Sequence, residues 1–151
     1  MIRLSRLTDY AIVIVAALAQ TPGHLQAAVG LAERTRIPEP TVAKVLKILA
    51  RGGVVDSARG VNGGYVINRA LSEIAIGEVI EAMNGPLTLT ACMDEEDTDC
   101  TIANYCLMKG RWAPVNDAIR AAFTTIKLSD MIRTVATPCG NCVIQSAPLK
   151  G

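Results

Sequence analysis

An amphipathic helix that runs directly into a glycine-rich hairpin is the feature that most restricts the folds open to this chain. Pro40 or Thr41 opens the helix, and apolar residues then recur at helical spacing until Gly52 and Gly53 end it. One face should therefore be buried, and the opposite face should stay polar. The buried stripe is Val42, Val45, Leu46 and Leu49, and the polar face carries Thr41, Lys44, Lys47 and Arg51.

A hairpin is predicted immediately after this helix. Two short strands, Val54–Ala58 and Tyr65–Asn68, flank the loop sequence RGVNGG, whose glycines give the backbone freedom at the tip. A second helix over residues 26–35 and a turn through residues 37–40 precede the amphipathic helix. Helix, turn, helix and hairpin in this order are typical of a winged helix-turn-helix domain. The sequence therefore predicts a mainly α fold with a two-stranded β wing.

The polar face of the amphipathic helix and the hairpin tip are the candidate nucleic-acid readers. Lysine binds phosphate or donates to guanine O6 and N7, and threonine contacts a base edge or a thymine methyl group. Arg59 at the wing tip suits the negative potential of a narrow minor groove. The alternative is an ordinary solvated helix face and a loop cation. The candidate DNA-binding residues are Thr41, Lys44, Lys47, Arg51, Arg59 and Asn62.

The distribution of charge points to a polyanionic partner for the N-terminal half. Residues 1–70 hold nine Lys or Arg against four Asp or Glu, about +5, whereas residues 71–151 hold six against ten, about −4. A basic half suggests nucleic acid, although so few charges also become uneven by chance. Only five residues are aromatic, so the core must be mainly Ala, Val, Ile and Leu, which favours helices over a β-sandwich.

The N-terminal residues imitate a secretory signal peptide but predict an amphipathic first helix instead. Arg3 and Arg6 precede an apolar run over residues 11–19, yet residues 8–10 interrupt the pattern. The run is also shorter than the roughly 20 residues that span a bilayer. We expect a cytoplasmic protein with no membrane partner, whose five cysteines are thiols, metal ligands or redox switches. Because the helix is apolar on most of its circumference, a second copy of the chain could cover one side.

The C-terminal half alternates between helices and an aperiodic segment. Ile76–Met83 predicts a short helix, and an apolar repeat from Val115 to Ile126 predicts a long one with Pro114 near its first turn. Ser129 is placed to cap a last short helix. We expect a winged-helix domain over residues 1–86, a cysteine loop over 87–110, a dimerisation helix region over 111–134 and a tail over 135–151.

Three cysteines in the aperiodic segment form a candidate metal site. Seven residues separate Cys92 from Cys100, and five separate Cys100 from Cys106. Structural zinc sites and ferredoxins mostly use closer pairs. Three soft ligands in one loop can still converge on an iron–sulfur cluster, and the alternative is a set of small apolar thiols. Five acidic residues between positions 94 and 99 weaken that alternative.

Several motifs, in the same order along the chain, resemble the IscR/NsrR family of iron–sulfur regulators. They are LTDYA at residues 7–11, RGxxGGY at 59–65 and GEVI at 77–80, followed by the three-cysteine loop. The opening LSRLTDY and the stretch EAxxGP at 81–86 most resemble the branch that regulates SUF-system cluster assembly. The similarity covers about residues 2–132, nearly the whole chain.

The resemblance implies a DNA-binding repressor of iron–sulfur assembly genes. It implies a homodimer with the long C-terminal helix at its interface, which would meet a pseudo-palindromic operator. It also implies that Cys92, Cys100 and Cys106 hold a 2Fe–2S or 4Fe–4S cluster. Zinc- or disulfide-controlled regulation is the first alternative, and a redox carrier or enzyme is the second. Catalysis has little support, because a single histidine leaves few options for a nucleophile–base pair.

The fourth cluster ligand is where this chain departs from the family pattern. Lys109 stands where some members have histidine, and a protonated lysine is a poor ligand. Other members take the ligand from the partner's first helix, at the position of Asp9, which could also simply cap that helix. Glu33, Asn104 or a small molecule are alternatives.

A second cysteine pair and the lone histidine lie outside that pattern. Cys139 and Cys142 have the spacing of a dithiol switch or of half a zinc site. No other ligand accompanies them in the tail, so we expect an incidental or labile pair. His24 follows Pro22 and Gly23 in a loop and is expected to face solvent.

Overall fold

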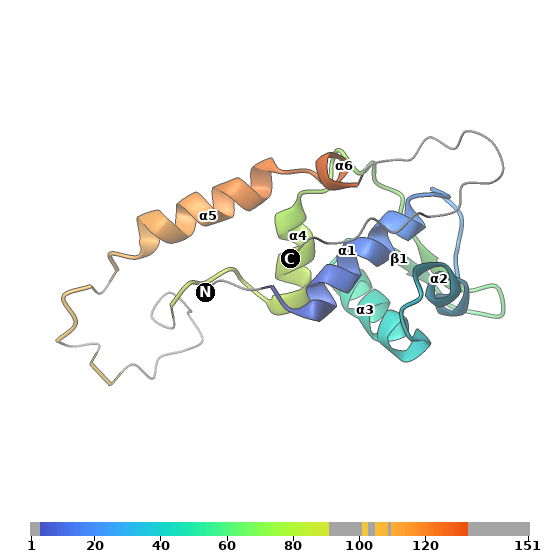
Figure 1. Cartoon of the computed structure of the whole chain (residues 1–151), viewed down its shortest axis with the longest axis horizontal. Coiled ribbons are helices and arrows are strands. Elements are labelled where there is room, and N and C mark those ends of the chain that lie inside the picture. The colour runs from blue at the N-terminus through green and yellow to red at the C-terminus, as the bar shows by residue number, and fades with distance from the viewer. Residues whose placement is uncertain (1–3, 91–100, 103–104, 109, 133–151) are drawn as a thin grey trace, which may run out of the picture.

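The computed structural model describes residues 4–90, 101–102, 105–108 and 110–132 and has the predicted mainly α architecture with a two-stranded wing (Figure 1). The helices pack into a body at one end, and the last long helix extends away from it. The elements in chain order are α1 (Arg6–Leu18), α2 (Ala28–Thr35), α3 (Glu39–Arg51), β1 (Asp56–Ala58), β2 (Gly64–Val66), α4 (Ile76–Asn84), α5 (Ala113–Thr125) and α6 (Leu128–Met131).

Helix α1 lies at the centre of the body and contacts α2, α3 and α4. Its residues Ile14, Val15 and Leu18 are completely buried. The predicted stripe of α3 is also completely buried against them. Removing apolar surface from water is the main favourable term in folding, so these two faces hold the body together. None of the described helices is long and apolar enough to cross a membrane.

The wing is an antiparallel pair in which Ser57 stands opposite Tyr65. On its other side, Tyr65 exchanges two backbone hydrogen bonds of 2.8 and 2.9 Å with Gln26, so β2 lies between β1 and this single residue. A side chain at Gly64 would bring its Cβ to 2.7 Å from the Gln26 carbonyl oxygen. Glycine at 64 is therefore required by the close approach of two backbones.

Several predicted boundaries are wrong by one or two residues. The second helix begins at Ala28 rather than 26, because Gln26 pairs with the wing. The strand predicted from Val54 begins at Asp56, because Val54 and Val55 are buried before the ladder starts. Helix α3 begins at Glu39, one or two residues before the predicted start at Pro40 or Thr41.

The predicted end of α3 is confirmed, whereas the predicted start of the last helix is wrong. Gly53 has φ +72, but Gly52 keeps φ −78, so only one of the two takes the left-handed conformation. Helix α6 begins at Leu128, not after a Ser129 cap. Its first turn is closed by the Asp130 carboxylate, which accepts a 2.9 Å hydrogen bond from the Lys127 N–H.

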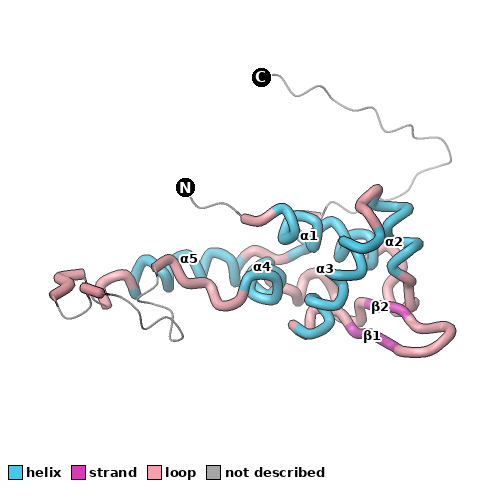
Figure 2. The backbone as a smooth tube through the Cα atoms, turned by 90° about the horizontal axis from the view of Figure 1, so that it is seen from below, coloured by secondary structure: helices cyan, strands magenta, loops and turns pink. Residues whose placement is uncertain are grey.

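The chain returns from α5 to the body beside α4 (Figure 2). Within the described residues, one antiparallel bridge joins Ala75 to Lys127 there. The Ile76 N–H donates to the Ile126 carbonyl at 3.0 Å, and the Leu128 N–H donates to the Ile74 carbonyl at 2.9 Å. This bridge fixes the base of α5 beside the start of α4.

Candidate nucleic-acid interface and cysteine site

Helix α3 carries the predicted polar side chains on the face opposite its buried stripe. Lys44, Lys47 and Arg51 are exposed, and Thr41 is half-buried. The predicted burial pattern of α3 is confirmed, because Val42, Val45, Leu46 and Leu49 are buried on the opposite side.

The wing loop projects two of the predicted residues, Arg59 and Asn62, into solvent. Gly60 has φ +119, and its carbonyl accepts a 2.9 Å hydrogen bond from the Gly63 N–H. A Cβ at Gly63 would lie 2.5 Å from the Ala58 carbonyl oxygen, so the loop closes this tightly only with glycine there. Val61 is 105% exposed, which sequence reasoning did not single out, although its place at the loop tip could have signalled it.

A hollow of about 450 Å³ separates α3 from the wing. Sequence reasoning missed Ser57 and Tyr65 in its lining. They face each other only because of the strand register, which the sequence does not specify on its own. The lining residues are Lys47, Ala50, Arg51, Ser57, Ala58, Arg59, Gly64 and Tyr65.

The candidate cluster ligands fall only partly within the described residues. Cys106 is half-buried and in no disulfide, whereas Cys92 and Cys100 lie outside the described part, as do Lys109, Asn104, Cys139 and Cys142. Within the described ranges, no three His, Cys, Asp or Glu side chains gather into a possible metal site.

Asp9 and Glu33 are both exposed, on α1 and α2 respectively. The alternative role of Asp9 as the helix cap belongs to Ser5, whose Oγ accepts a 3.1 Å hydrogen bond from the Thr8 N–H. His24 is exposed, with its Nδ1 3.1 Å from the Pro22 carbonyl oxygen, which matches the expected solvent-facing position.

Two buried polar side chains hold the chain on its way into the cysteine loop. Thr8 is fully buried, and its hydroxyl oxygen accepts a 3.1 Å hydrogen bond from the Asn84 amide at the end of α4. Asn116 of α5 is 4% exposed, and its Oδ1 accepts a 3.2 Å hydrogen bond from the Leu89 N–H. The segment that precedes Cys92 is thus fastened first to α1 and then to α5.

An ion pair fastens the segment after the wing to α4. The Arg69 guanidinium donates to the Glu78 carboxylate at 2.7 Å and to the Glu73 carbonyl at 3.0 Å. The hydrogen bond from Arg69 holds the pKa of Glu78 below its ordinary value, and a hydrogen bond from the Ala75 N–H adds to this effect. Both partners are partly exposed, so the pair adds little to stability.

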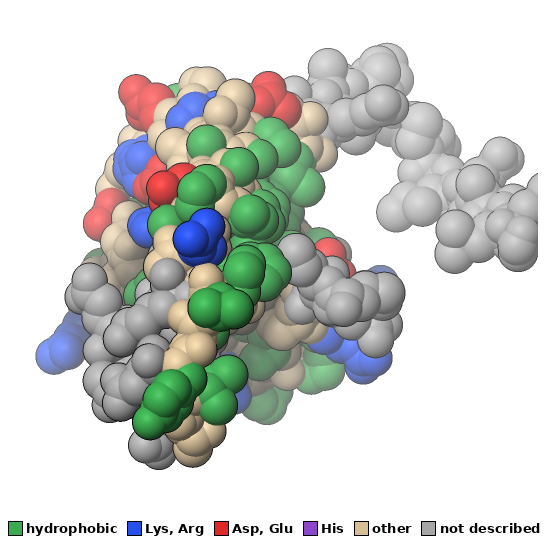
Figure 3. All heavy atoms as spheres, turned by 90° about the vertical axis from the view of Figure 1, so that its left-hand side faces the viewer, with side chains coloured by type: hydrophobic (Ala, Val, Ile, Leu, Met, Phe, Trp, Pro, Cys, Tyr) green, Lys and Arg blue, Asp and Glu red, His purple; other side chains and the backbone are tan. Residues whose placement is uncertain are grey.

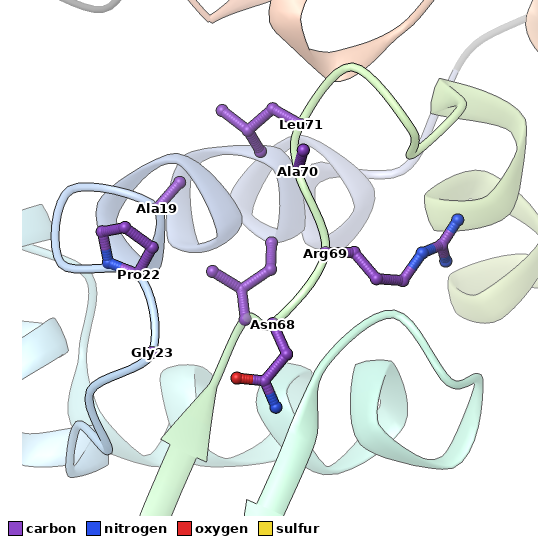
Figure 4. Close-up of a pocket in the computed structure, with 8 residues that line it drawn as sticks. Ala19, Pro22, Gly23, Asn68, Arg69, Ala70 and Leu71 are labelled. Atoms are coloured by element: carbon purple, nitrogen blue, oxygen red, sulfur yellow. The ribbon is translucent and has the colours of Figure 1, made fainter.

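A second hollow, of about 360 Å³, lies beside this ion pair (Figure 4). Arg69 points away from Ala19 and Pro22, so the space between them is mostly apolar. A catalytic pocket typically pairs a nucleophile with a base, and the residues that line this hollow include no such pair.

Comparison with known proteins agrees with this geometry. The chain matches the Rrf2 family, described as iron-dependent transcriptional regulators, over residues 4–134. It is 31% identical to the HTH-type transcriptional regulator NsrR of Shouchella clausii over 109 residues, which cover 72% of this chain and 73% of that protein.

Two solved structures have the same fold. CymR, the global cysteine regulator of B. subtilis, has a TM-score of 0.62 and 25% identity over 87% of this chain and 97% of that one. IscR of T. potens has a TM-score of 0.59 and 26% identity over 86% and 85%. The resemblance to IscR/NsrR-type regulators is confirmed, and these relatives are regulators rather than enzymes. The chain therefore belongs to the Rrf2 family of DNA-binding, winged-helix transcription regulators.

Proposed function

We propose that this chain is a homodimeric repressor of SUF-type iron–sulfur assembly genes, controlled by an iron–sulfur cluster on Cys92, Cys100 and Cys106. The donor chemistry fits, because thiolates are the ligands that such clusters use and Cys106 is a free, half-buried thiol. Asp9 of the partner would supply the fourth ligand, and its exposed position on α1 leaves it open to a second chain. The bound cluster would supply sensitivity to iron, oxidants and oxygen.

The observation that carries the proposal is the hydrogen bond from Leu89 to Asn116. It lies three residues before Cys92 and fastens the cysteine loop to α5. A change in the loop would therefore act on α5, and the bridge between Ala75 and Lys127 joins α5 to the winged-helix body. The proposed division into a DNA-binding head over residues 1–86, a sensing loop over 87–110 and a dimerisation region over 111–134 follows this path.

The exposed apolar side of α5 supports the homodimer. Val115 is 46% exposed, and Trp112 and Ile126 are also exposed, although all three are large apolar residues. Figure 3 views the molecule from the end at which α5 projects, and hydrophobic side chains gather in a band on this face. Val13 on α1 is exposed as well. A second copy covering these residues would remove the patch from water and set the distance between two reading heads.

The cysteine assignment is tested by spectroscopy of anaerobically purified protein. The wild type should absorb in the visible and contain iron and acid-labile sulfide. Cys92→Ala, Cys100→Ala and Cys106→Ala should each abolish the chromophore, whereas the matched variants Cys139→Ala and Cys142→Ala should keep it. Loss of the chromophore in a tail variant, with retention in Cys100→Ala, would overturn the assignment.

A thiol-based or zinc-based regulator is the second candidate. The likeness to CymR, the global cysteine regulator of B. subtilis, favours it, as does the spacing of Cys139 and Cys142. A colourless protein that binds operator DNA only in its oxidised or only in its reduced state would identify this alternative. A colourless protein with one zinc per chain would indicate a zinc site.

A further inference from the structure

Helix α4 stands between the long helix α5 and helix α3 of the DNA-reading head (Figures 1 and 2). Residues four apart lie on one line along a helix, and the next residue in the sequence lies about 100° further round. Positions 77 and 81 therefore form one line along α4, and positions 78 and 82 form a second line beside it. The contacts described below divide between these two lines.

The first line of α4 meets α5. A Cβ at Gly77 would lie 3.4 Å from the carbonyl carbon of Phe123, so this glycine brings α4 close to the α5 backbone. One turn further along α4, the Glu81 carboxylate accepts a 3.5 Å hydrogen bond from the Arg120 guanidinium. The two helices are thus held together at two points.

The second line of α4 meets both elements of the reading head. A Cβ at Gly52, the C-cap of α3, would lie 2.5 Å from the Ala82 Cβ, so the end of α3 touches α4 with no room for another methyl group. The Glu78 carboxylate accepts a 2.7 Å hydrogen bond from Arg69, three residues after the end of β2. One line of α4 therefore contacts α3 and the segment that leaves the wing.

Close contacts of this kind transmit displacement. Packed protein interiors have low compressibility, so a helix that is pushed along one line moves the elements that touch its next line. A movement of α5 would enter α4 at positions 77 and 81. It would leave α4 at positions 78 and 82, and it would reach α3 and the wing together.

We propose that α4 is a coupling helix, whose 77/81 line receives the movement of α5 and whose 78/82 line passes it to both reading elements. The proposal rests on the role of α5 in sensing and dimerisation proposed above, and it names the residues of the route. Because a coupling free energy is reciprocal, DNA bound to α3 and the wing also changes the local stability of α5. This reverse effect is measurable whether or not the protein carries a cluster.

Hydrogen exchange in α5 measures the reverse effect in the full-length protein. The anaerobically purified chain is compared free and saturated with the duplex that it binds most tightly from a random pool, at concentrations where sedimentation gives the same oligomeric state. Exchange over residues 113–125 should change by about 5-fold or more in the wild type, because local opening of α5 depends on its contacts with α4. Ala82→Gly, which leaves a gap opposite Gly52, should reduce this change to less than about 2-fold.

A matched double variant exchanges the two residues in contact. Gly52→Ala with Ala82→Gly has the same glycine in α4, and hence the same loss of helix propensity, but it refills the gap from the α3 side. It should restore the wild-type change in exchange. Gly30→Ala adds a methyl group to α2 where nothing lies within 4 Å, and it should leave that change unaltered. Chemical denaturation checks that each variant is folded.

Two results would overturn the coupling helix. One is unchanged exchange in α5 of the DNA-saturated wild type, and the other is a full change in folded Ala82→Gly. A folded double variant that fails to restore the change would also contradict the proposal, because the loss in Ala82→Gly would then come from helix propensity and not from the gap. A colourless wild type would instead contradict the proposed cluster and leave the exchange result standing.

Discussion

Helices α3 and α5 have the same length, 13 residues each, but opposite relations to the body. Helix α3 buries four aliphatic side chains completely, and its exposed face is polar. Helix α5 buries only Asn116, and its exposed face includes large apolar residues. The difference indicates that α3 is complete within one chain, whereas α5 presents a surface that a second molecule should cover.

An acidic residue on the exposed apolar side of α5 should have the largest effect on assembly. Val115→Asp would place an unpaired carboxylate in the proposed dimer interface, which should weaken the dimer by about 3–5 kcal/mol. Sedimentation should then show monomers at concentrations where the wild type is a dimer. Ala121→Asp, away from that side of the helix, is the control and should leave the dimer intact. A wild-type chain that is monomeric at micromolar concentration would contradict the inference that a second molecule covers α5.

A cavity in the α3 core should act on folding instead of assembly. Leu46 is completely buried, and Leu46→Ala should lower the free energy of unfolding by about 2–5 kcal/mol. Chemical denaturation of the isolated monomer, for example in the Val115→Asp background, measures this loss without a contribution from dimerisation. A loss below about 1 kcal/mol would mean that α3 is less firmly packed than its burial indicates.

The wing should affect DNA binding and leave both fold and assembly unchanged. Arg59→Ala should weaken operator binding by about 1–3 kcal/mol and blunt discrimination at A·T-rich flanks. Binding titrations on operators with altered flanks measure both effects. Unchanged operator affinity would show that the wing does not read DNA. Equal weakening on every flank would mean that Arg59 contacts only backbone phosphates.

The ion pair behind the wing should have the smallest effect, and only in acid. The pKa of Glu78 is lower in the folded chain than its ordinary value. The contribution of the ionised carboxylate to the free energy of unfolding is therefore complete above the ordinary pKa, and it is lost as the pH falls through the lowered pKa of the folded chain. Both partners are partly exposed, so the contribution is at most about 1 kcal/mol. Stability measured against pH should therefore fall less steeply for Glu78→Gln in that window. Parallel curves would show that the pair contributes nothing.

The sequence predicted what depends on local periodicity and missed what depends on contacts between distant residues. The stripe of α3 follows from helical spacing alone, and it is buried as expected. The start of α2 was wrong, because the backbone of Gln26 pairs with Tyr65, which is 39 residues away. Val54 and Val55 have the β-branched character of a strand, yet they fill the core before the ladder begins.

The same difference between local patterns and long-range contacts applies to the candidate nucleic-acid interface. The exposed cations were predictable, because Lys44, Lys47 and Arg51 lie on the polar side of a helical pattern and Arg59 lies in a glycine-rich hairpin loop. Ser57 and Tyr65 were not, since nothing in their own neighbourhood shows that α3 lies across from them. Asn116 was also missed, because a polar residue in an amphipathic helix gives no sign that it holds the backbone of Leu89.

The bridge between Ala75 and Lys127 fixes the C-terminal end of α5 to the body, and the hydrogen bond between Leu89 and Asn116 ties its N-terminal part to the segment before Cys92, so α5 is a lever that tilts together with that segment. Thirteen helical residues rise about 20 Å, so a tilt of about 10° at the bridge moves the far end by about 3–4 Å. That displacement is close to the rise of one base pair, about 3.4 Å. In a dimer joined through α5, a tilt too small to disturb either core would carry each reading head about one base-pair step along the duplex. Operators that differ by one or two base pairs in the spacing of their half-sites could then be told apart by the angle of one helix.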